Sequence, residues 1–153
     1  MRIEVLKKVF SRDLLKVKEE IELYQQESAI WKTENQISNA AGNLCLHLVG
    51  NLNTYIGATL GSSGYLRHRD LEFSLKDIPK ADLIRRIEDT MVVVETALSK
   101  LTDQQLQEDY PLLVWEEKTS TEYLLIHLAT HLAYHLGQIN YHRRLLDTNT
   151  STS

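Results

Sequence analysis

Glycine and proline are scarce in this chain, and that scarcity constrains its fold more than any other feature. Six glycines and two prolines occur in 153 residues. Because these two residues interrupt helices and mark turns most strongly, the long stretches without them predict long helices. No run of alternating apolar and polar residues competes as a set of strands.

Apolar residues recur at spacings of three and four in four segments, as expected for helices that bury one face. The simplest arrangement that buries the apolar faces of all four helices is a bundle. We therefore predict an all-α protein, an antiparallel four-helix bundle with long loops between its helices. The predicted helices span residues 2–25, 38–60, 79–101 and 119–146.

Capping residues mark several of the expected helix starts. Ser38 is the predicted N-cap of the second helix. Thr102 with Gln105, and Thr119 with Glu122, have the spacing of capping boxes, which predicts a short helical turn and the start of the last helix. The connection over residues 61–78 shows no helical period, and connections of that length are often functional.

Length and composition fit one compact domain, over residues 1–146, followed by a polar tail at 147–153 that we expect to be disordered. The chain carries 21 acidic and 17 basic residues, which argues against a nucleic-acid-binding surface. No apolar run is long enough to span a membrane. A single cysteine, Cys45, which we assign to the core, fits a reducing, cytoplasmic location.

The candidate chemistry lies in the histidines, four of which fall in the last predicted helix. His127, His131, His135 and His142 follow one another at steps of four, four and seven residues and therefore share one helical face. Flanking leucines indicate that this face points partly inward, where bare imidazole nitrogens are costly. Two histidines four residues apart can bind one Zn²⁺-like ion. Spacing leaves two pairs open, His127 with His131 or His131 with His135.

A third ligand is expected from another helix. His47 is the candidate, because it lies near the middle of the second predicted helix, level with the pairs in the last helix. Asn43 and Asn51 share its helical face and are candidates for hydrogen bonds that orient the ligands.

The motif HxxxHxGQ in the last helix, together with a lone histidine in the second, resembles the DinB-like superfamily, which includes bacillithiol- and mycothiol-dependent transferases. The resemblance implies a four-helix bundle that holds a divalent metal through His47, His131 and His135. Gly137 and Gln138 follow the last ligand as in the family pattern. Relatives often carry arginine directly after that ligand, where this chain has Leu136. Many family members are homodimers.

Other residues are expected to play supporting roles. His127 and His142 then lie outside the ligand set, in supporting or surface positions. Gln138 is a candidate partner for a ligand, and Arg69, within a charged segment at residues 67–73, is a candidate contact for an acidic substrate. No side chain stands out as a general base.

Three neutral ligands leave a coordination position open, which is the pattern of catalytic sites. By resemblance, we expect a metal-dependent transfer of a low-molecular-weight thiol to a small molecule, or a related hydrolase or isomerase activity. The metal is expected to be zinc or nickel, with iron as a further candidate. The alternatives are a non-catalytic, stress-linked module that the ion stabilises, and a metal-free bundle that dimerises.

Overall fold

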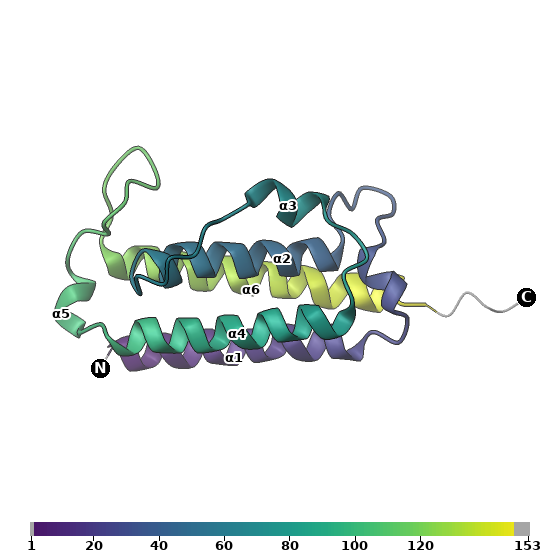
Figure 1. The fold of residues 1–153 in the computed structure, drawn as a ribbon, viewed down its shortest axis with the longest axis horizontal. Helices are drawn as coiled ribbons and strands as arrows, with labels where there is room; N and C mark the ends of the chain where they lie inside the picture. The colour runs from purple at the N-terminus through teal and green to yellow at the C-terminus, as the bar shows by residue number, and fades with distance from the viewer. Residues whose placement is uncertain (1, 149–153) are drawn as a thin grey trace, which may run out of the picture.

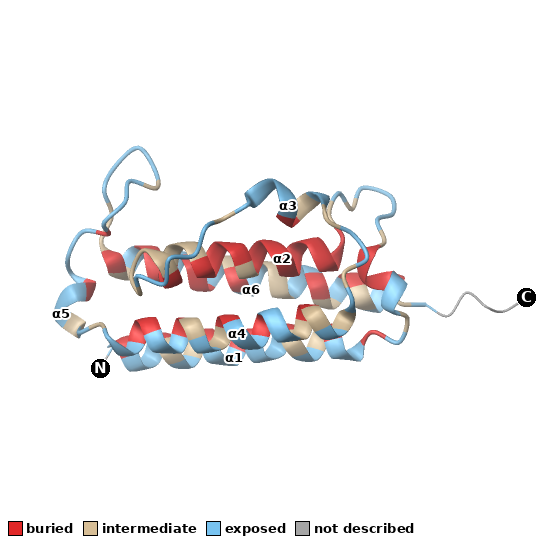
Figure 2. Ribbon diagram, viewed as in Figure 1, coloured by how far each residue is buried: buried red, intermediate tan, exposed pale blue. Residues whose placement is uncertain are grey.

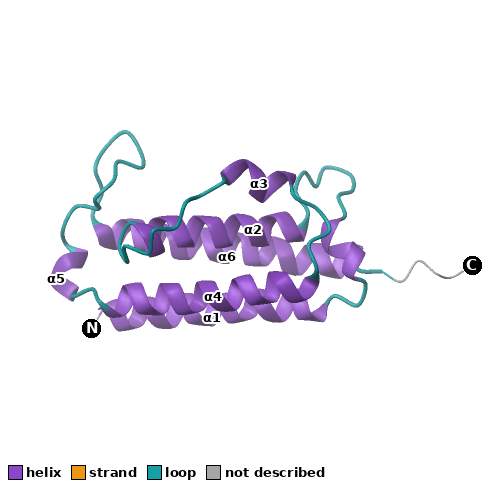
Figure 3. Cartoon of the chain, viewed as in Figure 1, coloured by secondary structure: helices purple, strands orange, loops and turns teal. Residues whose placement is uncertain are grey.

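The computed structural model describes residues 2–148, which contain helices and connecting loops but no β-strand (Figure 3). This confirms the all-α prediction. No helix in this part of the chain is long and apolar enough to cross a membrane. In chain order the elements are α1 (Arg2–Leu23), the 3₁₀-helix η1 (Glu27–Trp31), α2 (Ala41–Leu52), the π-helix η2 (Asn53–Ala58), α3 (Arg69–Ser74), α4 (Lys80–Ser99), α5 (Asp103–Leu106) and α6 (Thr121–Leu146).

The long helices α1, α2, α4 and α6 form the predicted bundle (Figure 1). The pairs α1–α4 and α2–α6 are antiparallel. The pairs α1–α6 and α2–α4 run parallel, because the connection after η2 returns along the whole bundle before α4 begins (Figure 1). Ion pairs of α1 agree with these directions. Lys7 lies 3.1 Å from Glu95 and Lys18 lies 3.4 Å from Glu88, so α1 and α4 run antiparallel. Glu20, near the C-terminal end of α1, pairs with Arg143, near the C-terminal end of α6, so these two helices run parallel.

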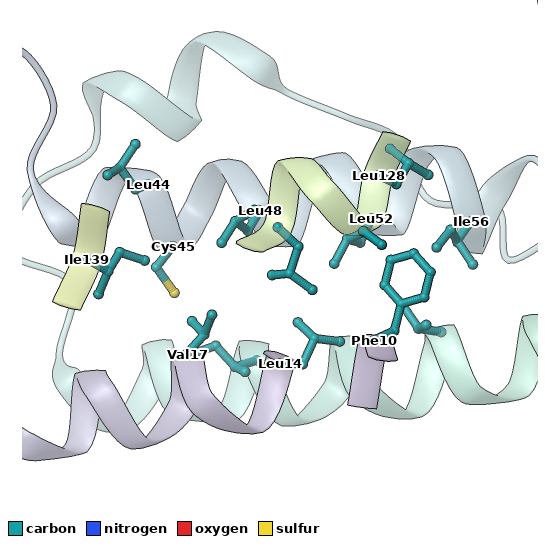
Figure 4. Packing of buried hydrophobic residues seen from close by; sticks show 14 of the residues in the cluster. Phe10, Leu14, Val17, Leu44, Cys45, Leu48, Leu52, Ile56, Leu128 and Ile139 are labelled. Atoms are coloured by element: carbon teal, nitrogen blue, oxygen red, sulfur yellow. The ribbon is translucent and has the colours of Figure 1, made fainter. Parts of the chain in front are cut away.

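The core is a single apolar layer between α1–α4 and α2–α6 (Figures 2 and 4). Phe10 and Leu14 from α1 meet Leu48 and Leu52 from α2 in this layer. Burying each such side chain contributes about 1.5–3 kcal/mol. Cys45 lies in the same layer, fully buried, and burial raises the pKa of its thiol to about 12. Its assignment to the core is confirmed.

The boundaries of the long helices agree with the prediction to within two residues except at α2. Ser38 is not the N-cap; Ala40 takes that position without a side-chain hydrogen bond. The reason is burial: Ala40 and Ala41 are fully buried, so packing rather than capping determines where the helix begins. The second predicted helix continues past Leu52 as the π-helix η2. Within η2 the Tyr55 carbonyl accepts a 2.6 Å hydrogen bond from the Tyr110 hydroxyl.

The capping predictions have two outcomes. Thr102 and Gln105 form the predicted capping box at the start of α5. At α6 the prediction was wrong by one residue, because Ser120 is the N-cap and accepts a hydrogen bond from the Tyr123 amide. Thr119 instead uses its carbonyl to pair with the Tyr110 amide in a short bridge between the two ends of the loop.

Residues 61–78 were predicted to lack a helix, but they contain α3. A helix of this length is marginal in water, so its stability has to come from tertiary packing. Its buried side chain is Glu72, which faces α2. Of the predicted tail, Asp147 is anchored, because its carboxylate accepts hydrogen bonds from the Gln25 and Gln26 amides at the end of α1. Residues 149–153 lie outside the described part of the chain.

His142 is buried rather than at the surface, which corrects that part of the prediction. Its Nδ1 lies 2.6 Å from the Tyr24 hydroxyl and its Nε2 lies 2.8 Å from the Lys32 carbonyl. Nε2 therefore carries the hydrogen and donates it to Lys32, while Nδ1 accepts from Tyr24. Both nitrogens are satisfied within the protein, so His142 is a structural residue.

Acidification from pH 7 to pH 5 should destabilise the metal-free protein partly through His142. Burial lowers the pKa of His142, and the hydrogen bond to Lys32 opposes this shift without reversing it. Below about pH 6.5 the unfolded chain therefore binds more protons than the folded chain, and stability falls as the pH falls. Urea unfolding with a chelator present should show a smaller loss in His142→Gln than in the wild type; equal losses would contradict the assignment.

Candidate metal centre

The antiparallel contact of α2 with α6 brings His47, His131 and His135 together. His47 Nε2 lies 3.2 Å from His131 Nε2, and His135 Nε2 lies 3.1 Å from the same atom. Ligand atoms of all three residues lie within 4.8 Å of one another. The sequence left His127 with His131 as an alternative pair, but the cluster within the described residues contains His135 instead.

The outer nitrogens of two of these rings are fixed by acceptors. His47 Nδ1 donates to the Glu72 carboxylate at 3.0 Å, and His135 Nδ1 donates to the Gln138 side-chain oxygen at 2.7 Å. In each neutral ring the hydrogen is thereby placed on Nδ1, which leaves a lone pair on Nε2. Both lone pairs point toward His131 Nε2.

His131 cannot satisfy both of these lone pairs with its single hydrogen. A hydrogen on its Nε2 can be donated to only one neighbour, and its buried Nδ1 has no hydrogen-bond partner among the described residues. The pKa of His131 is lowered to about 4, mainly by burial and to a smaller extent by the neighbouring His135 and His47. Burial also lowers the pKa of His47, against the raising effect of Glu72. These two imidazoles are therefore neutral at pH 7, the form that binds metal.

The converging lone pairs fit a divalent metal ion. Two imidazole nitrogens bound to one zinc at about 2.0–2.1 Å in tetrahedral geometry lie roughly 3.3 Å apart, close to the separations seen here. Imidazole is a good ligand for zinc, nickel, iron and copper. The residues present can thus hold an ion of this class.

Glu72 was not predicted from the sequence to belong to this centre. Its carboxylate receives two hydrogen bonds from Arg67, from Nε at 2.9 Å and from a terminal nitrogen at 3.0 Å, in addition to that from His47. The Glu72 side chain is only 7% exposed, so hydrogen bonds from Arg67 and His47 replace those that water would make to its carboxylate. Gly50 makes room for it, because a Cβ at this position would overlap the Glu72 carboxylate.

Asn43 holds α3 against α2. Its side-chain amide donates to the carbonyls of Glu72 and Leu75 at 3.0 and 2.8 Å, and its oxygen accepts from Lys76. It was expected to contact a ligand. Its hydrogen bonds go to the segment that carries Glu72, so it acts on His47 only through that residue.

A cavity of about 200 Å³ opens beside His47 and His131. The other predicted supporting residues, Asn51, His127 and Arg69, all line it. The His127 ring packs edge-on against Trp115, with ring centres 4.8 Å apart. A second cavity, of about 420 Å³, borders His135 and Gln138. The histidine cluster thus lies between two spaces that a small molecule can reach.

Gly50→Ala should destabilise the protein by about 1–3 kcal/mol, because the new methyl group competes with a buried carboxylate that is already fixed by Arg67 and His47. Gly137→Ala is the matched control, since a Cβ at this position on α6 meets nothing within 4 Å. Alanine there should stabilise the helix by about 0.5–1 kcal/mol. Urea unfolding measures both changes, and equal effects would show that Gly50 does not accommodate Glu72.

Comparison with protein families gives a match over nearly the whole chain. A family model described as "Protein of unknown function (DUF1572)" matches residues 3–153, nearly the whole chain. A search among curated proteins finds no match. The matched range includes every helix of the bundle and all three clustered histidines. The chain therefore belongs to the DUF1572 family, whose function is unknown.

Proposed function

We propose that this chain is a DinB-like metalloenzyme that binds one divalent transition metal through His47, His131 and His135. The observation that carries the proposal is the convergence of three Nε2 atoms, two of which present lone pairs set by Glu72 and Gln138. Within a protein, lone pairs that face one another need a shared electrophile, and a metal ion supplies it. Zinc or nickel is the ion we propose first, with iron as a further candidate.

The proposed reaction is the transfer of a low-molecular-weight thiol to a small molecule, or a related hydrolase or isomerase reaction. A bound ion would supply Lewis acidity and favour the thiolate form of a thiol. The protein's own residues would orient the histidine ligands and receive the substrate. Glu72 and Gln138 hold the rings of His47 and His135 by their Nδ1 hydrogens, and the cavity beside His131 would receive the substrate.

The cavity favours a catalytic site over a purely structural one. A structural ion is enclosed by four protein ligands, whereas a catalytic ion has three and an open position. The described residues offer three clustered histidines, with space beside two of them. Under the alternative, a non-catalytic module that the ion stabilises, chelation should unfold the chain.

Among the histidines, metal content should depend on His47, His131 and His135 and not on His127. Purified wild-type protein should contain close to one equivalent of a transition metal, and His47→Ala, His131→Ala and His135→Ala should each lose it. His127→Ala is the matched control, because His127 lies one turn from His131 but outside the cluster. Elemental analysis measures the content. A wild type that contains no metal and takes up neither zinc nor nickel would refute the proposal.

Glu72→Gln should weaken metal binding by about 10–100-fold, the usual effect of losing a carboxylate behind a ligating histidine. Glu20→Gln is the matched control, since Glu20 is also a largely buried carboxylate paired with an arginine, Arg143, but lies away from the histidines. Competition with a chromophoric chelator measures the affinity. Equal affinities of both variants would show that Glu72 serves stability alone.

Chelation distinguishes the enzyme from the stabilised module. The apolar layer of the bundle does not include the three histidines, so the metal-free protein should keep its helical circular dichroism at 25 °C. Unfolding on addition of a chelator would favour the structural alternative.

A further inference from the structure

The cavity beside His47 and His131 has an unbalanced charge. Arg67 and Arg69 line it together with His127, and no aspartate or glutamate among the described residues does. Glu72 lies behind His47 and is bonded to Arg67, so it compensates one of the two arginines. Its neighbour Asp70 does not line the cavity.

Arg69 is the arginine that remains available. No ion pair or hydrogen bond engages its guanidinium within the described part of the chain, and its Cζ lies 5.4 Å from the centre of the Phe73 ring. The side chain is exposed at the cavity wall. A guanidinium presents paired N–H groups in the geometry that a carboxylate accepts.

Asn51 provides a second, independent sign of a ligand. It is 92% buried, one turn after His47 on α2, and lines the same cavity. Its side-chain oxygen is buried and has no hydrogen-bond partner among the described residues. A buried amide oxygen left without a donor costs about 1–3 kcal/mol, which a hydrogen-bond donor on a ligand would recover.

The remaining wall is apolar and aromatic. Leu124 and Leu128 of α6, Val114 and Trp115 complete it. Its volume of about 200 Å³ is below the 300–1,000 Å³ typical of drug-sized ligands. The cavity therefore suits a small molecule with an apolar body and one charged end.

We propose that this cavity binds a small carboxylate that also carries a hydrogen-bond donor: its charged group pairs with Arg69, its donor bonds to the Asn51 side-chain oxygen, and its apolar body packs against Trp115. The inference names the substrate class of the metal site and rests on the proposed function in that respect. A single free guanidinium matches the single charge of a carboxylate, and the cavity wall places such a ligand next to His131.

Benzoate is the probe for the charged group, and acetophenone, which has nearly the same shape without the charge and without an N–H donor for Asn51, is its neutral counterpart. Calorimetric titration of the full chain is carried out on zinc-loaded protein and on protein treated with chelator, and tryptophan fluorescence reports on Trp115. Benzoate should bind about 10–100-fold more tightly than acetophenone, the effect of one charge-assisted hydrogen-bonded pair. Arg69→Gln should abolish that preference in both forms.

Arg144→Gln is the matched control. Arg144 is also an exposed arginine next to an aromatic ring, 5.2 Å from the centre of Tyr141, but it does not line the cavity. Its benzoate affinity should equal that of the wild type. Absence of benzoate binding, equal binding of acetophenone, or unchanged binding in Arg69→Gln would each overturn the inference.

The two forms of the protein separate this inference from the proposed function. Arg69-dependent benzoate binding by a chain that takes up no metal would leave the carboxylate site standing and refute the metal site. Metal uptake without Arg69-dependent benzoate binding would leave the metal site standing and refute the carboxylate site.

Discussion

The buried carboxylate of Glu72 is the interaction on which the rest of the site depends. It accepts hydrogen bonds from His47 and from Arg67, 25 and 5 residues away along the chain. A charge this deeply buried is costly unless its partners are complete, so the three residues have to assemble together. Their assembly fixes the His47 ring with its Nε2 lone pair toward α6, and it places Arg67 at the wall of the cavity.

The topology of the bundle makes this assembly possible. The antiparallel packing of α2 on α6 sets His47 level with the histidine pair, since all three lie near the middle of their helices. The long crossover after η2 then passes back over α2 and lays α3 on its outer side (Figure 1). Asn43 fixes α3 through two carbonyls, and Gly50 leaves the space that Glu72 fills. The apolar layer on the opposite side of α2 supplies stability independently of the polar centre (Figure 4).

Periodicity was sufficient to predict the long helices and the bundle, because these features depend on local pattern. Spacing indicated His47 and His131 but left His127 and His135 as alternatives, and the resemblance of the HxxxHxGQ motif was needed to select His135. The missed features depend on tertiary contacts. Glu72 lies in a short charged segment without a helical period, and only packing on α2 makes that segment helical. Gly50, in the interior of the helix predicted over residues 38–60, was the available signal of a close approach. Ser38 was misjudged because burial of Ala40 and Ala41 sets the start of α2. The roles expected for Asn51, His127 and Arg69 remain predictions, although all three line the cavity.

X-ray absorption spectroscopy of the zinc-loaded protein tests the central claim most directly, because it counts the imidazoles around the ion. We expect three imidazole nitrogens at about 2.0–2.1 Å and one further light atom that exogenous ligands displace. His135→Ala should reduce the imidazole count. A coordination shell without imidazole scattering, or one closed by four protein ligands, would contradict the account.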